Sequence, residues 1–231
     1  MNCSGMTFRR VRRLILVAWI GACTSAYGAH EDLFVAPGSK VQSSTIGALT
    51  GKWWQWANSM VGYKSPVRDM TGKNCANGQE GDIWFLAGSY SQNKVARKCT
   101  IPSGKYIMFP LVNWLLFPGK DPSIECEGVK QGVKRLADRI ERLHLEIDGE
   151  PVQDLKRYRA ATDKCFRLYA DSDFSEFLGR TSPAASDGYW VVLKPLPAGE
   201  HIIRFGGKQP RFKQNIEYTI TISAQDSHGQ P

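Results

Sequence analysis

The chain has 231 residues, and its 30 Lys and Arg against 22 Asp and Glu give a formal net charge of +8 at pH 7. Four arginines fall within residues 1–28, which contain no acid, so the remainder carries 26 basic and 22 acidic residues, a net charge of only +4. These charges are scattered along the sequence, which disfavours a nucleic-acid-binding protein. A hydrophobic content of 42% over this length is sufficient for one sizeable core or two small ones.

Residues 1–28 predict a secretory signal peptide. A basic block ending at Arg13 precedes the apolar run 14–22 (LILVAWIGA), and small residues then lead to a cleavage position after Gly28. The apolar run is shorter than the roughly 20 residues of a membrane-spanning helix, so we expect no permanent transmembrane anchor. In an alternative, Cys23 becomes the lipidated first residue of a bacterial lipoprotein. Cleavage after Gly28 predicts a periplasmic or secreted bacterial protein, and lipidation at Cys23 predicts a lipid-anchored one.

Four cysteines follow the expected cleavage position: Cys75, Cys99, Cys126 and Cys165. An even number of cysteines in an exported chain predicts disulfides. Of the three pairings that four cysteines allow, we favour Cys75 with Cys99 and Cys126 with Cys165, because each closes a moderate loop around a predicted strand or helix. A metal site or a redox pair is the alternative, but the chain contains no C-x-x-C and no histidine near a cysteine. We therefore expect structural disulfides.

A first helix is predicted at about 45–61. Apolar side chains recur there at spacings of three and four residues, which places them on one helical face: Ile46, Leu49, Trp53, Trp56 and Met60. Trp53 and Trp56 are therefore expected in the core. Trp54 lies about 100° round the helix, where it either widens the buried face or sits at its rim, and is the tryptophan of the segment that we nominate for ligand binding.

A second amphipathic helix is predicted at about 122–142. Asp121 has the character of an N-cap, and Pro122 suits the first helical position. The apolar face repeats at spacings of four and three residues: Val129, Val133, Leu136, Ile140 and Leu143. Charged residues between these positions predict that the opposite face meets solvent.

The remainder of the chain predicts β-structure. Apolar runs in residues 82–90 and 105–118 are bounded by Gly and Pro, and period-2 alternation marks residues 215–223. Pro110 donates no ladder hydrogen bond, so we expect a strand edge or a bulge at that position. The expected fold class is α+β and β-rich: an antiparallel β-sandwich, in one disulfide-stabilised domain over residues 29–231, covered by the two helices.

The sequence contains no recognised catalytic or metal-binding motif. Its four histidines form no His-x-His or H-E-x-x-H pattern, and neither a G-x-S-x-G elbow nor a phosphate-binding loop occurs. Carboxylates such as Asp69 and Glu80 leave a glycosidase site open, because spacing along a sequence does not give the separation of two carboxylates in space. We expect no catalytic residue, no metal and no cofactor.

Five segments combine Trp, Cys, Gly and Pro in a distinctive way: WWQWANS (53–59), D-x-T-G-x-x-C (69–75), C-A-x-G-Q-x-G-D-I-W-F-L-A-G (75–88), R-x-C-x-x-P-x-G-K-x-x-x-F-P-x-x-N (97–113) and L-x-P-L-x-x-G-E-H-x-I-x-F-x-G (193–207). Together they resemble a family of uncharacterised exported bacterial proteins. The resemblance implies one exported unit and implies no particular activity.

The resemblance also draws attention to the long loop predicted at 64–82, which is rich in Gly, Asn, Asp and Pro. A long loop in a compact domain is either functional or held in place, and Cys75 is expected to hold this one. Asp69 and Gln79 are polar residues of this loop that packing beside Trp84 does not explain.

The expected function is that of an exported, non-catalytic cell-envelope protein that binds a ligand such as a glycan or another envelope component. The nominated ligand-binding residues are Trp54, Trp84, Gln79 and Asp69. Aromatic faces stack on sugar rings while amides and carboxylates fix the orientation of a ligand. A secreted hydrolase with an unrecognised carboxylate site and a structural or interaction protein of the envelope are the alternatives, and the oligomeric state stays open.

Overall fold

A computed structural model describes residues 33–60, 62–121, 123–168 and 181–224; the expected signal peptide, Cys23 and Pro122 lie outside these ranges. The described elements are, in chain order, β1 (Lys40–Val41), β2 (Ser44–Thr45), α2 (Ile46–Asn58), η1 (Gly62–Lys64), β3 (Ile83–Phe85), β4 (Val95–Ile101), β5 (Tyr106–Leu116), α3 (Cys126–Ala137), β6 (Arg142–Ile147), β7 (Glu150–Pro151), η2 (Leu155–Tyr158), β8 (Arg159–Ala161), β9 (Ala185–Leu193), β10 (Gly199–Gln209) and β11 (Phe212–Ile222). Among the described residues, no helix has the length and apolar character that crossing a membrane requires.

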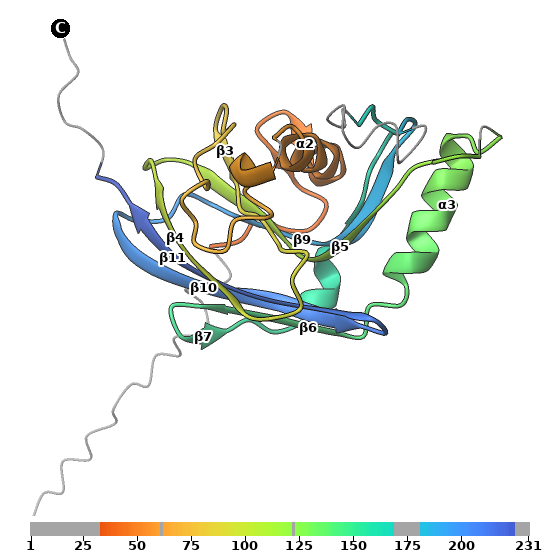
Figure 1. The fold of residues 1–231 in the computed structure, drawn as a ribbon. Coiled ribbons are helices and arrows are strands. Elements are labelled where there is room, and N and C mark those ends of the chain that lie inside the picture. The colour runs from red at the N-terminus through yellow and green to blue at the C-terminus, as the bar shows by residue number, and fades with distance from the viewer. Residues whose placement is uncertain (1–32, 61, 122, 169–180, 225–231) are drawn as a thin grey trace, which may run out of the picture.

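Two sheets form the body of the protein (Figure 1). One has the strand order β4-β11-β10-β6-β7 and the other β3-β5-β9-β8. The fold is α+β and β-rich, as expected, but the sheets are mixed, because β4 pairs parallel with β11 and β3 pairs parallel with β5. The chain passes from β3 to β4 in the other sheet before it returns as β5, so β3 and β5 run in the same direction. Periodicity in a sequence does not report strand direction, so the expectation of antiparallel pairing throughout was wrong at these two edges.

The main core lies between the two sheets. Alternate residues of β11 are almost completely buried, and the residues between them face outward. Phe109 of β5 and Phe205 of β10 meet across the interface, with ring centroids 4.6 Å apart. Burial of each large apolar side chain of this kind stabilises the fold by about 1.5–3 kcal/mol.

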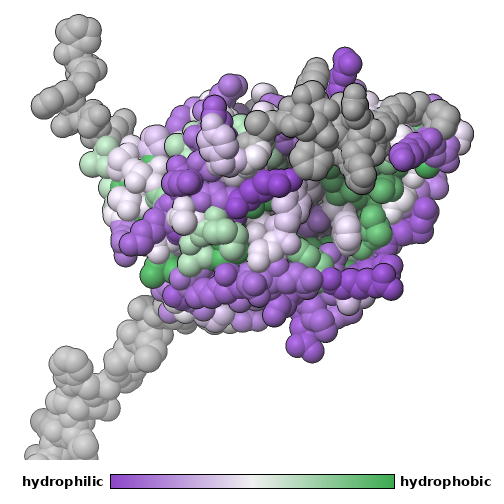
Figure 2. Space-filling view, viewed as in Figure 1, coloured by the Kyte–Doolittle hydropathy of each residue, from purple (hydrophilic) through white to green (hydrophobic). Residues whose placement is uncertain are grey.

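The outer face of the five-stranded sheet is charged. Arg204 of β10 donates to Glu217 of β11 at 2.7 Å and also pairs with Glu146 of β6, its cross-strand neighbours in the register. In Figure 2 a band of hydrophilic side chains follows this sheet, and hydrophobic side chains show above the band, between the layers. Exposed ion pairs contribute little to stability, so this face depends on the core beneath it.

Helix α2 covers the other face of the β3-β5-β9-β8 sheet (Figure 1). It begins after Thr45, whose hydroxyl accepts a hydrogen bond from the N–H of Ala48 at 3.0 Å. Trp53 is buried as its spacing predicted, stands edge-on to Trp190 of β9 at 5.4 Å and donates from Nε1 to the carbonyl of Leu86 at 3.0 Å. A second apolar core therefore lies between α2 and this sheet.

Helix α3 is shorter than the expected 122–142 segment. Asp121 does not cap it: its carboxylate accepts from the N–H and hydroxyl of Ser123, at 2.9 and 2.6 Å, and the helix begins only at Cys126. The helix ends at Ala137, and Leu143 belongs to β6 instead. The spacing of apolar residues continued past the helix end because Leu143 also meets the period-2 pattern of the strand, and that pattern decides its conformation.

Both expected disulfides are present. Cys75–Cys99 joins the loop before β3 to strand β4, and Cys126–Cys165 joins the start of α3 to the segment after β8. They close separations of 24 and 39 residues, and each is expected to stabilise the fold by about 3 kcal/mol, mainly by restricting the unfolded chain.

Candidate ligand-binding site

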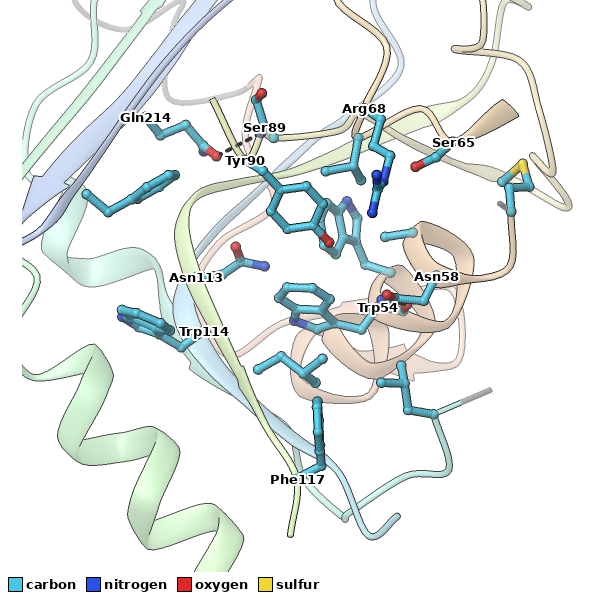
Figure 3. Close-up of a pocket in the computed structure, with 18 of the residues that line it drawn as sticks. Trp54, Asn58, Ser65, Arg68, Ser89, Tyr90, Asn113, Trp114, Phe117 and Gln214 are labelled. Atoms are coloured by element: carbon cyan, nitrogen blue, oxygen red, sulfur yellow. Dashed lines mark hydrogen bonds between the residues drawn. The ribbon is translucent and has the colours of Figure 1, made fainter. Parts of the chain in front are cut away.

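A cavity of about 590 Å³ opens between α2, the end of β5, the β10–β11 hairpin and two loops around residues 62–68 and 88–90 (Figure 3). Its described lining contains six aromatic residues: Trp53, Trp54, Tyr90, Trp114, Phe117 and Phe212. Four carboxamides lie among them: Asn58, Asn113, Gln209 and Gln214. A volume of several hundred Å³ with an apolar wall and a few polar groups is typical of small-molecule sites.

Trp54 forms part of the cavity wall and is held firmly. Its Nε1 donates to Ser186 Oγ at 2.9 Å, and its ring stands edge-on to Trp53 with centroids 5.0 Å apart. Figure 3 shows the indole across the cavity from Tyr90, a residue that is 59% exposed. Because the N–H of Trp54 is already bonded to the protein, the face of its ring is the part that a ligand can use.

The end of β5 reaches the cavity because of a bulge. The register of β5 against β9 shifts between Pro110 and Val112, as the proline predicted, and Asn113 then pairs with Gly188. A Cβ at Gly188 would lie 2.5 Å from the Cα of Asn113, so only glycine allows the two strands to approach this closely. The bulge changes which face the following side chains occupy, and Asn113 and Trp114 line the cavity. Trp114 also packs against the core between the sheets.

Gln214 of β11 fixes the bulge from inside. Its Nε2 donates to the carbonyls of Pro110 and Leu111, at 3.1 and 2.7 Å, and its Oε1 accepts from the N–H of Ser89 at 3.2 Å. Figure 3 shows the contact between Gln214 and Ser89. A Cβ at Gly88 would lie 2.4 Å from Gln214 Oε1, so a larger residue there would displace this amide from its hydrogen bonds. One buried amide thus joins the bulge to the loop that carries Tyr90.

Asp69, nominated from the sequence, organises the loop before β3. Its carboxylate accepts from the N–H and hydroxyl of Thr71 and from the N–H of Asn74, each at 2.8 Å. Burial raises the pKa of this carboxyl, but these donors outweigh burial, and the pKa lies below its ordinary value. The structure places Asp69 outside the cavity lining.

Replacement of Asp69 by asparagine is expected to lower the free energy of unfolding at pH 7 by about 2 kcal/mol, because an amide turns a donor toward one of these N–H groups. The folded pKa is depressed, so the stabilisation is complete above the unfolded value near pH 4 and is lost as the pH falls through the folded pKa. Urea unfolding at pH 7, 5 and 3 should show that the difference in the free energy of unfolding between the wild type and Asp69→Asn becomes smaller only at the lowest pH. The exposed Asp82→Asn serves as control, and a difference that does not vary with pH would contradict this role.

Gln79 and Trp84 also lie outside the cavity lining. Gln79 donates from Nε2 to the carbonyls of Cys75 and Phe85, at 2.9 and 2.8 Å, and accepts from the N–H of Phe85 at 2.9 Å. Trp84 is 7% exposed and packs in the core between the sheets. The structure therefore brings Trp54 alone of the four nominated residues to the cavity.

The residues that sequence reasoning missed come from segments far apart in the chain. Asn113 carried a detectable signal, because it is the one amide in the apolar run 106–118. Gln209 and Phe212 lie on either side of the β10–β11 turn in a stretch of ordinary polar composition. Nothing local distinguishes them, since their position at the cavity depends on how β11 pairs with β10 and faces β5.

No acidic group, histidine or cysteine lines the cavity among the described residues, and Arg68 is the charged residue of that lining. In the described ranges, no cluster of three His, Cys, Asp or Glu side chains could hold a metal ion. Asp148, a carboxylate outside this lining, accepts from the N–H of Ile202 at 2.7 Å and pairs with His201 at 2.8 Å. The arrangement at the cavity is suited to binding.

The fold and the site define a disulfide-bonded α+β domain with an aromatic, amide-lined cavity. No family model, no curated protein and no solved structure matches the chain. The interpretation of the site therefore depends on its geometry.

Proposed function

We propose that this protein is an exported binding protein of the bacterial cell envelope, and that its cavity takes a small ligand or the end of a glycan chain. The observation that carries the proposal is the cavity of about 590 Å³, whose wall contains both aromatic rings and uncharged amides. Sugars present an apolar ring face and a rim of hydroxyl groups, and this wall offers a partner for each.

Export is supported by three independent features. The N-terminal segment has the order of a signal peptide, the chain forms two disulfides, and five segments resemble a family of exported bacterial proteins. Disulfides persist in oxidising compartments such as the periplasm and are rare in the cytosol.

Binding is favoured over hydrolysis by the chemistry of the wall. Glycoside hydrolysis commonly uses two carboxyl groups that flank the scissile bond. The described lining of the cavity supplies amides where such an enzyme has acids. Asp69, the first carboxylate that the sequence suggested, already accepts three hydrogen bonds within its own loop.

The proposal is tested by a thermal-shift screen of the exported protein, purified with both disulfides formed, against oligosaccharides and other envelope components. A ligand at about 100 times its Kd stabilises the folded state by about 2.7 kcal/mol, which raises the Tm by about 5–10 °C in a protein of this size. Tryptophan fluorescence should change in the same titration, because Trp54 and Trp114 line the cavity. If no compound of the panel stabilises the protein, and pull-down from an envelope extract instead recovers a protein partner, the protein is an interaction protein and the proposal fails.

A further inference from the structure

Two carboxamides of the cavity have polar atoms without a partner. Asn113 Nδ2, a donor, and Gln209 Oε1, an acceptor, are buried and make no hydrogen bond within the part of the chain that the structure describes. Gln209 is only 5% exposed, and both residues line the cavity. Of five such unpartnered atoms among the described residues, three belong to the cavity lining, the third being Trp114 Nε1. The unpartnered groups are therefore concentrated at this site.

Unpartnered buried polar groups destabilise a folded protein, and native structures contain few of them. Gln214, which lies beside them in the same lining, shows the ordinary outcome: its donor and its acceptor are both bonded to the backbone. Packing does not require an amide at positions 113 and 209, since leucine or methionine would fill a similar volume without a polar atom to satisfy. A ligand that supplies the missing partners accounts for both amides.

The charge of that ligand follows from the two free atoms. A carboxylate offers only acceptors, so it would face Gln209 Oε1 with an unfavourable oxygen–oxygen contact. An ammonium group offers only donors, so it would leave Asn113 Nδ2 without an acceptor. A hydroxyl or an acetamido group both donates and accepts and meets both requirements. Figure 3 shows the amide of Asn113 directed into the cavity, between Trp114 and Tyr90.

We infer that Asn113 and Gln209 make this cavity selective for an uncharged sugar unit, held through its hydroxyl or acetamido groups, over the corresponding sugar acid or amino sugar. The inference rests on the proposed function and adds the ligand class to it. Arg68 is an exposed residue of the lining, so solvent and salt screen its charge and weaken its attraction for an acidic ligand.

The first experiment compares four oligosaccharides of the same length and linkage, built from glucose, glucuronic acid, N-acetylglucosamine or glucosamine, by calorimetric titration of the exported protein. At least one uncharged oligomer is expected to bind about tenfold or more tightly than its charged counterpart. Comparison of glucose with N-acetylglucosamine shows whether hydroxyl or acetamido groups are recognised. The affinity for the uncharged oligomer that binds should change less than about twofold between about 0.05 and 0.5 M salt, because no charge is neutralised on binding. Equal or tighter binding of the acid or the amine overturns the inference, while the proposed function of the protein as a binding protein stands.

The second experiment separates a ligand-binding role of the amides from a structural one. Gln209→Met and Asn113→Leu should leave the ligand-free Tm unchanged or raise it, because an unsatisfied group is removed, and should weaken binding of the uncharged oligomer about tenfold. The exposed Gln153→Met is the matched control and should change neither property. Variants that bind as tightly as the wild type, or that lose stability, contradict the inference. A wild-type protein that binds none of the four oligomers removes the glycan proposal and the inference together.

Discussion

Replacement of Arg97 by methionine is expected to lower the free energy of unfolding by about 4 kcal/mol. Arg97 is 2% exposed, and its guanidinium donates five hydrogen bonds. The acceptors are the carbonyls of Val67, Asp69, Ala87 and Gly88 and the hydroxyl of Tyr218. Methionine keeps the apolar stem of the side chain and removes the donor of the Val67, Asp69 and Gly88 carbonyls. The carbonyl of Ala87 still accepts from the hydroxyl of Tyr218, at 3.2 Å.

The same substitution should also damage the cavity. Val67 and Gly88 belong to the two loops that form part of its wall, and Arg97 of strand β4 donates a hydrogen bond to each of them. Urea unfolding measures the loss of stability, and ligand titration below the midpoint measures the loss of the site. Lys98→Met, at the next and exposed position of β4, should unfold within about 0.5 kcal/mol of the wild type. Equal effects of the two substitutions would mean that the hydrogen bonds of Arg97 do not hold the loops.

Replacement of Trp54 by alanine is expected to weaken ligand binding about 30-fold or more, which corresponds to about 2 kcal/mol. The indole presents its face to the cavity, and alanine removes that surface while it leaves the amides in place. Trp54→Phe should retain most of the affinity, because it keeps a six-membered aromatic face, although it loses the pyrrole ring and the N–H that is bonded to Ser186. The order of affinities, wild type, phenylalanine, alanine, therefore tests stacking directly.

Titration calorimetry with the best ligand of the screen makes this comparison. Lys52→Ala is the matched control, because Lys52 lies on the exposed side of the same helix and outside the described lining of the cavity. An alanine variant that binds as well as the wild type, while Lys52→Ala also has no effect, would show that the ligand does not meet Trp54.

The parts of the fold that sequence could predict are those determined by local pattern. The burial of Trp53 and Trp56 follows from helical spacing, and the pairing of the four cysteines follows from the loops that they close. The alternation in β11 likewise gives its buried face. Each of these features depends on residues close together in the chain, or on a small number of possible pairings.

The parts that sequence could not predict depend on residues that meet only in the folded chain. Asp69 and Gln79 are polar loop residues that resemble ligand-binding groups until their backbone partners are known. Gln209 and Gln214 have the same residue type and lie five positions apart, yet Gln214 is satisfied by the bulge of β5 and Gln209 Oε1 has no partner among the described residues. The difference arises from contacts between β11 and β5, which no local pattern encodes.

Nuclear magnetic resonance of the isotope-labelled, oxidised protein shows directly whether the ligand lies in the cavity between α2, the end of β5 and the β10–β11 hairpin. During titration with the best-stabilising oligosaccharide, we expect shifts in the indole N–H signals of Trp54 and Trp114 and in the side-chain amide signals of Asn113 and Gln209. The indole signal of Trp84 should stay in place. Saturable shifts confined to the charged outer face around Arg204, with the four cavity signals unchanged, would contradict this location of the ligand.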